Sequence, residues 1–355
     1  VMGMPGLDDD LQARTWKVAS QAYRLSGRLE EAKSLIEDAI AIHHKLGNKR
    51  QEGVCIGALG GICGNMGMMT ETSEHLQHAL AIAREVGNRV HEGVVLSNLG
   101  TLHTDLGMTA EASDYFNSAL DIHQEVGDLD SEVHVLNALG NLHRNLGRPS
   151  EAQELYDRGH VIAKRAKLLA LEGTVLGNLG LLLHEQGRSA EARRHHDRAL
   201  AIHRETGNRR SEAIVLNGLG NICRDRGELA GAKGYYEQAL EIAVEAHLLP
   251  LEGVLLGNLA MLARDLGRPE ESWALGQEAL VINRKIGNRR SEGHTLHNQG
   301  VLCRDQGRPE EAREYFERAS EIYHEIGAID LEGKAQRLLG KAYEDEDRIE
   351  EARRE

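Results

Sequence analysis

A forty-residue repeat runs through almost the whole of this sequence and limits what the chain can fold into. The stretch from Gly207 to Ala246 matches the segments before and after it without insertion or deletion. Two glycine columns keep this register: one is Gly27, Gly67, Gly107, Gly147, Gly187, Gly227, Gly267 and Gly307, and the other is Gly60, Gly100, Gly140, Gly180, Gly220, Gly300 and Gly340. Repetition at such a period indicates a solenoid in which each unit packs on its neighbours.

Each unit encodes two amphipathic helices, which we call helix A and helix B. In the unit around Gly220, helix A follows the N-cap Asn208, ends at Gly227, and repeats apolar residues at Ile214, Leu216, Leu219, Ile222 and Cys223. Helix B starts near Leu229 and repeats Ala232, Tyr235, Tyr236, Ala239, Leu240 and Ile242. Such a hairpin cannot bury both apolar faces alone. We therefore predict an all-α solenoid of stacked helix-turn-helix units, with at least sixteen helices, a right-handed superhelix and no sheet.

The columns of Leu99, Gly100, Gly107, Ala112, Phe116 and Ala119 resemble the tetratricopeptide repeat, whose motif has Leu-Gly in helix A and Ala, aromatic, Ala in helix B. The resemblance extends from about Asp8 to the end. Its forty-residue period is similar to that of spindle-orientation adaptors and many bacterial signalling proteins. Departures from the motif are Thr72, Ser272, Gly276, and the pairs Lys167-Leu168 and His247-Leu248 where other units join through Gly-Asn. We expect different packing or turns there.

The register predicts eight full repeats, numbered 1 to 8 in chain order. They are expected at 8–47, 48–87, 88–127, 128–167, 168–207, 208–247, 248–287 and 288–327. A ninth starts near Ala328 and reaches Glu355 inside its expected helix B, as in a fragment of a longer protein. Residues 1–7 are expected to be a lead segment or an expression remnant, and 8–355 a single solenoid domain.

Composition narrows the class of partner. The 42 basic and 56 acidic residues give a net charge of −14, which repels phosphate backbones and argues against nucleic acid. No apolar run approaches the roughly 20 residues that span a bilayer, and no signal peptide opens the sequence, so we expect no membrane and a cytoplasmic protein. The four cysteines are too few for a disulfide scaffold, and we expect them to be small buried hydrophobes.

No pattern of residues nominates a catalytic or metal centre. Phosphate-loop, HExxH and CxxC motifs are absent, and no residue stands out as a nucleophile, so we expect no enzyme, no metal and no cofactor. Of the 18 histidines, His43, His123 and His203 are eighty residues apart and too distant to share one ion. His294 and His297 are spaced i, i+3 on one helix, where they would bind at most an adventitious metal.

One arc of helix A, opposite its core face, carries amides and arginines instead of the Glu and Lys of an ordinary solvated face. An amide both donates and accepts, which suits the main chain of a bound peptide, and arginine offers a forked donor to carboxylates. The candidate residues are Asn98, Asn137, Asn141, Arg144, Asn178, His184, Asn217, Asn221, Arg224, Asn258, Arg264, Asn298 and Arg304.

The resemblance implies that this arc lines a concave groove, because helix A does so in tetratricopeptide proteins, where its asparagines and basic residues hold the partner. The expected lysine positions of the co-chaperone clamp hold Gly57, Ser97, Asn137 and Gly177, which argues against capture of a free C-terminal carboxylate. In the alternative interpretation, the asparagines bond the backbone of neighbouring helices and the arginines pair with the adjacent row of Asp225, Asp265 and Asp305.

Two functions fit these features. The first is a protein-interaction scaffold that holds a protein or peptide, with or without acidic side chains, in the groove. The second is the sensor or oligomerisation arm of a multidomain bacterial signalling or defence protein, whose NTPase, kinase or caspase-like effector lies outside this sequence. The 32 arginines against 10 lysines suggest a GC-rich, bacterial genome and favour the second setting.

Overall fold

The computed structural model describes residues 7–25 and 27–354, and these form seventeen α-helices with no strand among them. The predicted all-α solenoid of stacked hairpins, with at least sixteen helices, is confirmed. Helix α1 begins at Leu7, and the other residues of the expected lead segment lie outside the described residues. Odd-numbered helices are helix A of successive repeats, and even-numbered helices are helix B.

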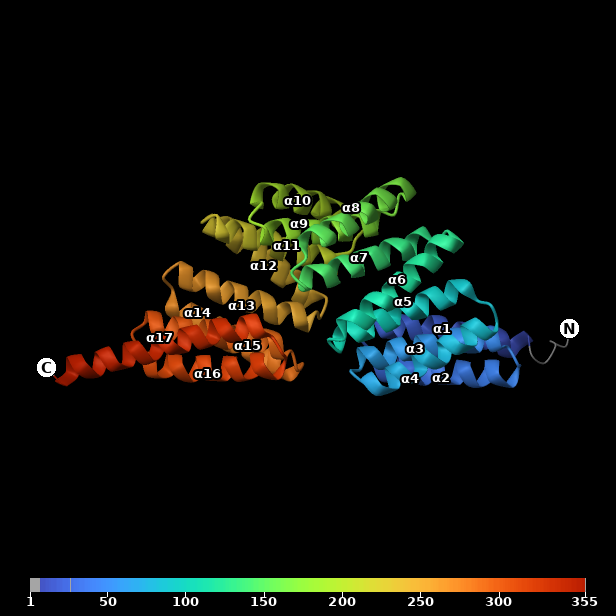
Figure 1. The fold of residues 1–355 in the computed structure, drawn as a ribbon, viewed down its shortest axis with the longest axis horizontal. Helices are drawn as coiled ribbons and strands as arrows, with labels where there is room; N and C mark the ends of the chain where they lie inside the picture. Colours follow the sequence, from blue (N-terminus) through green and yellow to red (C-terminus); the bar gives the residue numbers. More distant parts are fainter. Residues whose placement is uncertain (1–6, 26, 355) are drawn as a thin grey trace. The chain divides into compact units, whose positions relative to one another are not determined.

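The chain divides into two compact units, Val1–Leu182 and Leu183–Glu355, and the division falls within α9. In the first unit, successive hairpins stack side by side from α1 to α8 (Figure 1). Its helices are α1 (Leu7–Leu25), α2 (Leu29–Lys45), α3 (Lys49–Asn65), α4 (Met69–Glu85), α5 (Arg89–Asp105), α6 (Thr109–Val126), α7 (Leu129–Asn145), α8 (Pro149–Ala166) and the larger part of α9 (Leu169–Glu185).

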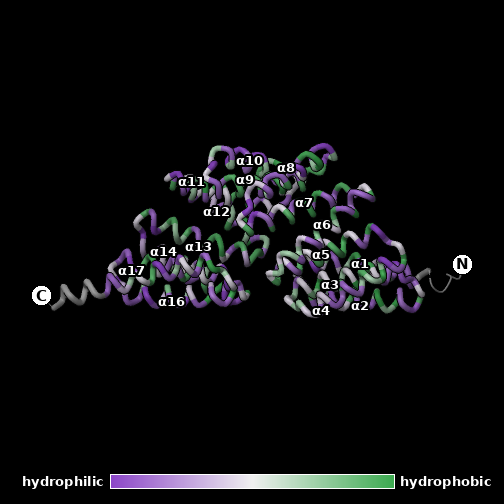
Figure 2. Tube along the Cα trace, viewed as in Figure 1, coloured by the Kyte–Doolittle hydropathy of each residue, from purple (hydrophilic) through white to green (hydrophobic). Residues whose placement is uncertain are grey.

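The second unit continues the same pattern from the end of α9. Its further helices are α10 (Ser189–Glu205), α11 (Arg209–Asp225), α12 (Leu229–Glu245), α13 (Leu249–Asp265), α14 (Pro269–Lys285), α15 (Arg289–Asp305), α16 (Pro309–Glu325) and α17 (Ile329–Arg354). Hydrophobic and hydrophilic residues alternate along the helices, as the sequence periodicity requires (Figure 2). None of the described helices combines the length and the apolar character that a membrane span needs.

The turn inside each repeat depends on a glycine with positive φ. In repeat 6, Gly227 has φ 74°. Its N–H donates to the Arg224 carbonyl at 2.9 Å, and the Glu228 N–H donates to the Cys223 carbonyl at 2.8 Å. Positive φ recurs along the whole first glycine column. A side chain would cost roughly 1–2 kcal/mol in this left-handed conformation. The turn that ends helix A therefore explains why glycine recurs at this position of the repeat.

The joint between repeats uses the same conformation, even where glycine is missing. Lys167 and His247 have φ 58° and 53°, close to the 66° of Gly207 at the equivalent position. A different turn was expected at these two joints, and the structure shows the same turn with a non-glycine residue in it. The remaining contacts of the hairpin stack outweigh the local strain, which is on the order of 1–2 kcal/mol per residue.

Close helix packing explains Gly60, Gly100, Gly140, Gly220 and Gly300 of the second glycine column, whereas an ideal Cβ on Gly340 would meet nothing within 4 Å. A Cβ atom on Gly100 would lie 2.6 Å from the ring of Phe116 in the helix B of the same repeat. Gly140 and Gly220 meet Tyr156 and Tyr236 in the same way, too closely for any Cβ. Glycine in helix A and the aromatic residue in helix B are therefore two halves of one contact.

The expected apolar face of helix A is correct except at one position. In α11, Leu216, Leu219, Ile222 and Cys223 are buried, whereas Ile214 is 50% exposed. Position 214 lies on the side of helix A away from helix B, so its apolar side chain belongs to the surface. All four cysteines of the chain are free and buried, as expected, and burial raises the pKa of the Cys55 and Cys303 thiols to about 11.

Buried carboxylates tie adjacent repeats together. Glu212 is almost fully buried at the start of α11 and accepts hydrogen bonds from Arg204 at 3.0 Å and Arg209 at 2.9 Å. Arg209 also reaches Glu245 in the next helix at 3.1 Å. Glu92 and Glu292 repeat this pattern with their own pairs of arginines. Charge-assisted bonds to a buried acceptor fix the angle at which one repeat follows another.

The last helix differs from the expected ninth repeat. We expected a turn between its helix A and helix B, yet α17 continues unbroken over 26 residues. The position that holds the turn glycine in the earlier repeats is Asp347 here. A side chain costs roughly 1–2 kcal/mol in the left-handed conformation, which Lys167 and His247 tolerate at their joints, whereas at Asp347 the right-handed helix continues.

Candidate binding grooves along helix A

The surface of helix A forms a hollow in each of the two units. We call the hollow of the first unit the N-terminal groove. Its volume is ≈ 450 Å³. It lies between α5, α6 and α7. Its lining is Val94, Ser97, Asn98, Thr101, Phe116, His123, Ser131, His134, Val135, Asn137, Ala138 and Asn141. Every polar group in this lining is uncharged or a histidine.

The second unit holds the C-terminal groove, with a volume of ≈ 420 Å³. Helices α9, α11, α13 and α15, all of them helix A, supply its lining. The lining is His184, Asn217, Asn221, Arg224, Asp225, Gly253, Val254, Gly257, Asn258, Met261, Ser291, His294, Thr295 and Asn298. The groove thus collects amides from three successive repeats.

Nine of the thirteen candidate residues line these two grooves. They are Asn98, Asn137 and Asn141 in the N-terminal groove, and His184, Asn217, Asn221, Arg224, Asn258 and Asn298 in the C-terminal groove. Arg264 lines a small neighbouring cavity. Asn178, Arg144 and Arg304 are not in the lining of either groove.

Pairs of asparagines link helix A of adjacent repeats. Asn178 Nδ2 donates to Asn137 Oδ1 at 2.8 Å, and eighty residues later Asn258 Nδ2 donates to Asn217 Oδ1 at 2.7 Å. Each bond uses one oxygen and one N–H of the pair. The nitrogen of Asn217 and the oxygen of Asn258 therefore retain their own capacity to donate and to accept.

Two other asparagines have a structural partner in helix B. The Tyr156 hydroxyl donates to Asn141 Oδ1 at 2.7 Å, and the Tyr236 hydroxyl donates to Asn221 Oδ1 at 2.7 Å. The alternative interpretation expected the asparagines to bond neighbouring backbone, whereas the structure gives these two a tyrosine hydroxyl. The two asparagine oxygens accept from the tyrosine hydroxyls, which would otherwise be buried without an acceptor. The amide nitrogens of Asn141 and Asn221 can still donate to a bound partner.

The arginines form a ladder of ion pairs with the aspartates of their own repeat and of the next one, as the alternative interpretation expected. Arg224 lies 3.4 Å from Asp225 and 3.9 Å from Asp265. The ladder continues with Arg264 to Asp265 at 3.0 Å, Arg264 to Asp305 at 4.0 Å and Arg304 to Asp305 at 3.7 Å, and the Nε2 atom of His184 lies 3.2 Å from Asp225. Each arginine is neutralised from within the chain, so this edge of the groove carries little net positive charge.

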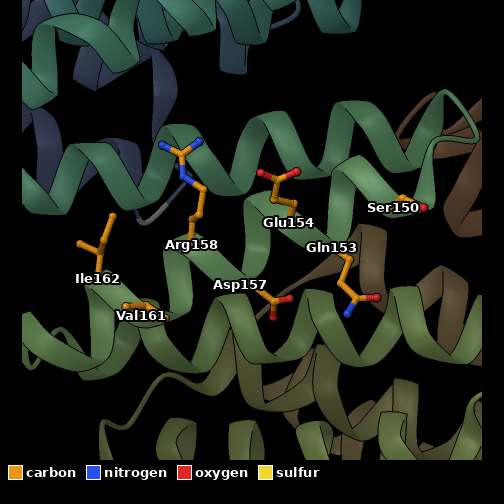
Figure 3. A pocket seen from close by; sticks show the side chains of 7 residues that line it. All are labelled: Ser150, Gln153, Glu154, Asp157, Arg158, Val161 and Ile162. Carbon is orange, nitrogen blue, oxygen red and sulfur yellow. The ribbon is translucent and has the colours of Figure 1, made fainter.

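A third hollow, of ≈ 680 Å³, lies along α8 (Figure 3). Its lining is Ser150, Gln153, Glu154, Asp157, Arg158, Val161 and Ile162. All seven side chains come from one helix B, whereas the grooves along helix A gather polar side chains from several helices. The two grooves are therefore the stronger candidates for a binding site.

Comparison with known sequences agrees with the geometry. Sequence profiles described as tetratricopeptide repeat match residues 55–125, 94–165, 171–243, 251–325 and 298–355, which is well over half of the chain. The chain belongs to the tetratricopeptide repeat family. No curated protein sequence matches it.

Several solved structures share the fold at low sequence identity. The apo form of the quorum sensor NprR from B. thuringiensis has a TM-score of 0.66 at 15% identity, over 87% of each chain. A Rap protein complexed with competence and sporulation factor has a TM-score of 0.63 at 11% identity, over 96% of this chain and 98% of the other. A signal-transduction ATPase with a tetratricopeptide repeat sensor, from Pyrococcus horikoshii, has a TM-score of 0.60 at 16% identity, over 92% of this chain and 53% of the other.

The apolar and hydroxyl residues of the tetratricopeptide grooves were missing from the sequence-based candidates. Val94 in the N-terminal groove and Val254 in the C-terminal groove occupy the same repeat position as the half-exposed Ile214. Ser131 and Ser291 also share a position. The signal was present in part, because Val94, Ile214 and Val254 are apolar at this position whereas His134, Thr174 and His294 are not, but periodicity alone assigns such apolar residues to the core.

Two histidines of α15 are held neutral: His294, which lines the C-terminal groove, and His297, one turn further along the helix. Burial, reinforced by Arg290, lowers the pKa of His294 to about 4, and burial also lowers the pKa of His297. The His294 ring packs edge-on against Tyr323, and the His297 ring against Phe316. Among the described residues, no cluster of three or more His, Cys, Asp or Glu side chains is arranged to hold a metal ion. Neutral imidazoles at a groove wall offer hydrogen bonds without charge.

Proposed function

We propose that this chain is a protein-interaction solenoid that holds a peptide or an extended protein segment in its helix A grooves. Tetratricopeptide repeats are generally scaffolds or sensors rather than enzymes. The observation that carries the proposal is the pairing of Asn217 with Asn258. This pair lies in a groove of ≈ 420 Å³ and leaves one amide donor and one acceptor for the main chain of a ligand.

The chemistry of the grooves favours an uncharged segment. Val94 and Val254 provide apolar contact beside the amides, and the one cation of the C-terminal groove, Arg224, already faces Asp225 and Asp265. An acidic side chain of a partner would have to displace one of these aspartates. Main-chain recognition with small or apolar side chains is therefore the better fit than capture of an acidic peptide.

A sensor role in bacterial signalling or defence is the second candidate. It is supported by what the structural neighbours are: a quorum sensor, a Rap protein complexed with competence and sporulation factor, and a signal-transduction ATPase with a tetratricopeptide repeat sensor. In this setting the grooves would bind the signal, and an effector elsewhere in the protein or in a partner would respond. In both candidate functions, the role of the grooves is to bind a ligand.

The test removes the asparagine pair that has no other structural partner. Asn217→Ala with Asn258→Ala should weaken binding of peptides selected from a randomised display library on the wild-type protein. Each lost hydrogen bond costs about 0.5–1.5 kcal/mol, so the pair should lower affinity roughly 5- to 150-fold. Isothermal titration calorimetry measures the change, and circular dichroism checks that the helices are intact.

Two controls make this result specific. Glu237→Ala with Gln238→Ala alters the exposed side of α12 and should leave affinity unchanged. Asn221→Ala is unsuitable as the main test, because it leaves the Tyr236 hydroxyl without its acceptor and so destabilises the fold. Wild-type affinity in the Asn217 and Asn258 double variant would show that the ligand binds elsewhere.

A further inference from the structure

The contact between repeats 7 and 8 breaks the repeat pattern at several core positions at once. In repeats 2 to 6, position 299 is equivalent to Leu59, Leu99, Leu139, Leu179 and Leu219, and position 276 to Leu76, Phe116, Tyr156, His196 and Tyr236. Here these two positions hold Gln299 and Gly276. Ala260 stands in the glycine column, Ser272 stands where most repeats have alanine, and Thr295 stands in a column of mostly valine.

These departures meet at one place. Gln299 occupies the space of the missing aromatic residue, because a Cβ on Gly276 would overlap its amide nitrogen. Its Nε2 donates to the Trp273 carbonyl at 3.2 Å. The side chain is only 2% exposed, and its Oε1 has no hydrogen-bond partner. A buried amide oxygen without a donor costs about 1–3 kcal/mol, which calls for an explanation.

A small cavity adjoins Gln299. Ala260, Ser272, Gly276, Thr295 and Gln299 all line it, and the space open to the centre of a water molecule is ≈ 10 Å³. The cavity shares Gly257, Met261, Thr295 and Asn298 with the C-terminal groove. It is therefore a recess beside the groove, with Met261, a flexible side chain, at their common wall.

The lining selects for a small hydrogen-bond donor. Gln299 Oε1 is an acceptor, and the Thr295 hydroxyl donates to the Ser291 carbonyl at 2.8 Å, which leaves its lone pairs as further acceptors. Arg264 in the same lining is paired with Asp265 and Asp305, so the recess carries little net charge and suits an uncharged donor. The volume suits a group the size of one water molecule and excludes rings and long side chains.

We propose that this recess is a specificity subsite of the C-terminal groove that receives the hydroxyl of a serine or threonine in the bound segment, which donates to Gln299 Oε1. The proposal rests on the proposed peptide-binding function and adds to it the identity of one side chain. A site that pairs a buried acceptor with a ligand hydroxyl discriminates against ligands that lack the hydroxyl.

The experiment compares two proteins against one probe, a randomised peptide library displayed on yeast. The variant Ala260→Gly, Gly276→Phe, Gln299→Leu restores the residues that the other repeats carry and fills the recess. Peptides selected on the wild type should show serine or threonine enriched at one position, and those selected on the variant should not. Replacing that serine by alanine should weaken binding to the wild type about 2- to 13-fold and leave binding to the variant unchanged.

Further variants keep the test decisive. Gln299→Leu alone removes the acceptor with a smaller change in packing and should also abolish the preference. If serine or threonine is enriched to the same degree on the wild type and on the variants, or is not enriched on the wild type, the proposal is overturned. Gln299 would then be a structural amide with one bound water. If Asn217→Ala with Asn258→Ala weakens all selected peptides while no hydroxyl preference exists, only the subsite fails. If no peptide is selected at all, the proposed function fails with it.

Discussion

Single residues in the left-handed conformation show where this solenoid departs from its own consensus. Lys167 and His247 adopt the positive φ that glycine supplies at the equivalent joints. Both residues are exposed, so their side chains contribute little packing to offset the strain. The cost is local to each joint, and it can be measured by substitution.

Lys167→Gly and His247→Gly should each stabilise the protein by about 1 kcal/mol. The gain is the strain of a left-handed side chain, roughly 1–2 kcal/mol, less the larger entropy that glycine loses on folding. Urea denaturation followed by circular dichroism gives the value. Lys164→Gly, three residues earlier inside α8, is the control and should destabilise by about 1 kcal/mol. A loss of stability in Lys167→Gly would mean that the side chain makes a contact worth more than the strain.

At the scale of one element, α3 is the helix with the most glycine, and its glycines are of two kinds. A Cβ on Gly53 would lie 2.6 Å from Ile82, and one on Gly60 would lie 3.0 Å from Leu76. Gly61 has nothing within 4 Å of its ideal Cβ position. Close packing therefore explains Gly53 and Gly60 but not Gly61, which weakens the helix without a compensating contact.

Gly61→Ala should stabilise α3 by about 0.5–1 kcal/mol, whereas Gly60→Ala should destabilise the protein because Leu76 must move. Native-state hydrogen exchange reports both effects on the amides of α3. In the wild type, these amides should exchange faster than those of α7 and α11, because a linear array gives a weak helix no distant support. Similar protection in all three helices would show that packing has overridden the intrinsic cost of the glycines.

The helices themselves could be predicted from the sequence with few errors. Turn glycines and N-cap asparagines mark where helices begin and end, and a fixed period transfers each assignment to the next repeat. The prediction was wrong at positions where the backbone conformation does not follow from the repeat period and the residue type. Asp347 allows α17 to continue, and the joints at Lys167 and His247 keep a turn that their residue types disfavour.

The roles of individual groove residues were harder to predict because helix A has neighbours on more than one side. A polar residue on it can face the groove, its own helix B or the next helix A. Asn217 and Asn221 are one turn apart, yet the first bonds Asn258 and the second accepts from Tyr236. A paired occurrence of tyrosine with an asparagine fifteen residues earlier, in repeats 4 and 6, was visible in the sequence and would have identified the second role.

At the scale of the whole molecule, the net charge of −14 contrasts with the local balance of the C-terminal groove. Its arginine ladder is compensated by Asp225, Asp265 and Asp305. Screening by salt acts on uncompensated charge, so a neutral groove should bind its ligand with little dependence on ionic strength.

Affinity of the selected peptides for the wild type should change by less than about threefold between low and physiological salt. Arg224→Gln, Arg264→Gln, Arg304→Gln removes the arginine partners of the three aspartates, and binding should then depend on salt, with basic peptides favoured. Titration calorimetry at several salt concentrations measures this. A strong salt dependence in the wild type, abolished in the variant, would mean that the arginines reach carboxylates of the ligand.

The contacts within each unit run between successive helices and between helix A of neighbouring repeats. In a protein with one central core, exchanging leucine for glutamine and an aromatic ring for glycine would disturb every layer around them. Here the disturbance should remain local, because among the described helices the main contacts of α14 and α15 are with each other, with α13 and with α16. In a chain of this design, substitutions can therefore change the core of one repeat contact, such as the recess at Gln299, and leave the neighbouring repeats unchanged. New ligand preferences can then arise through a few stepwise substitutions.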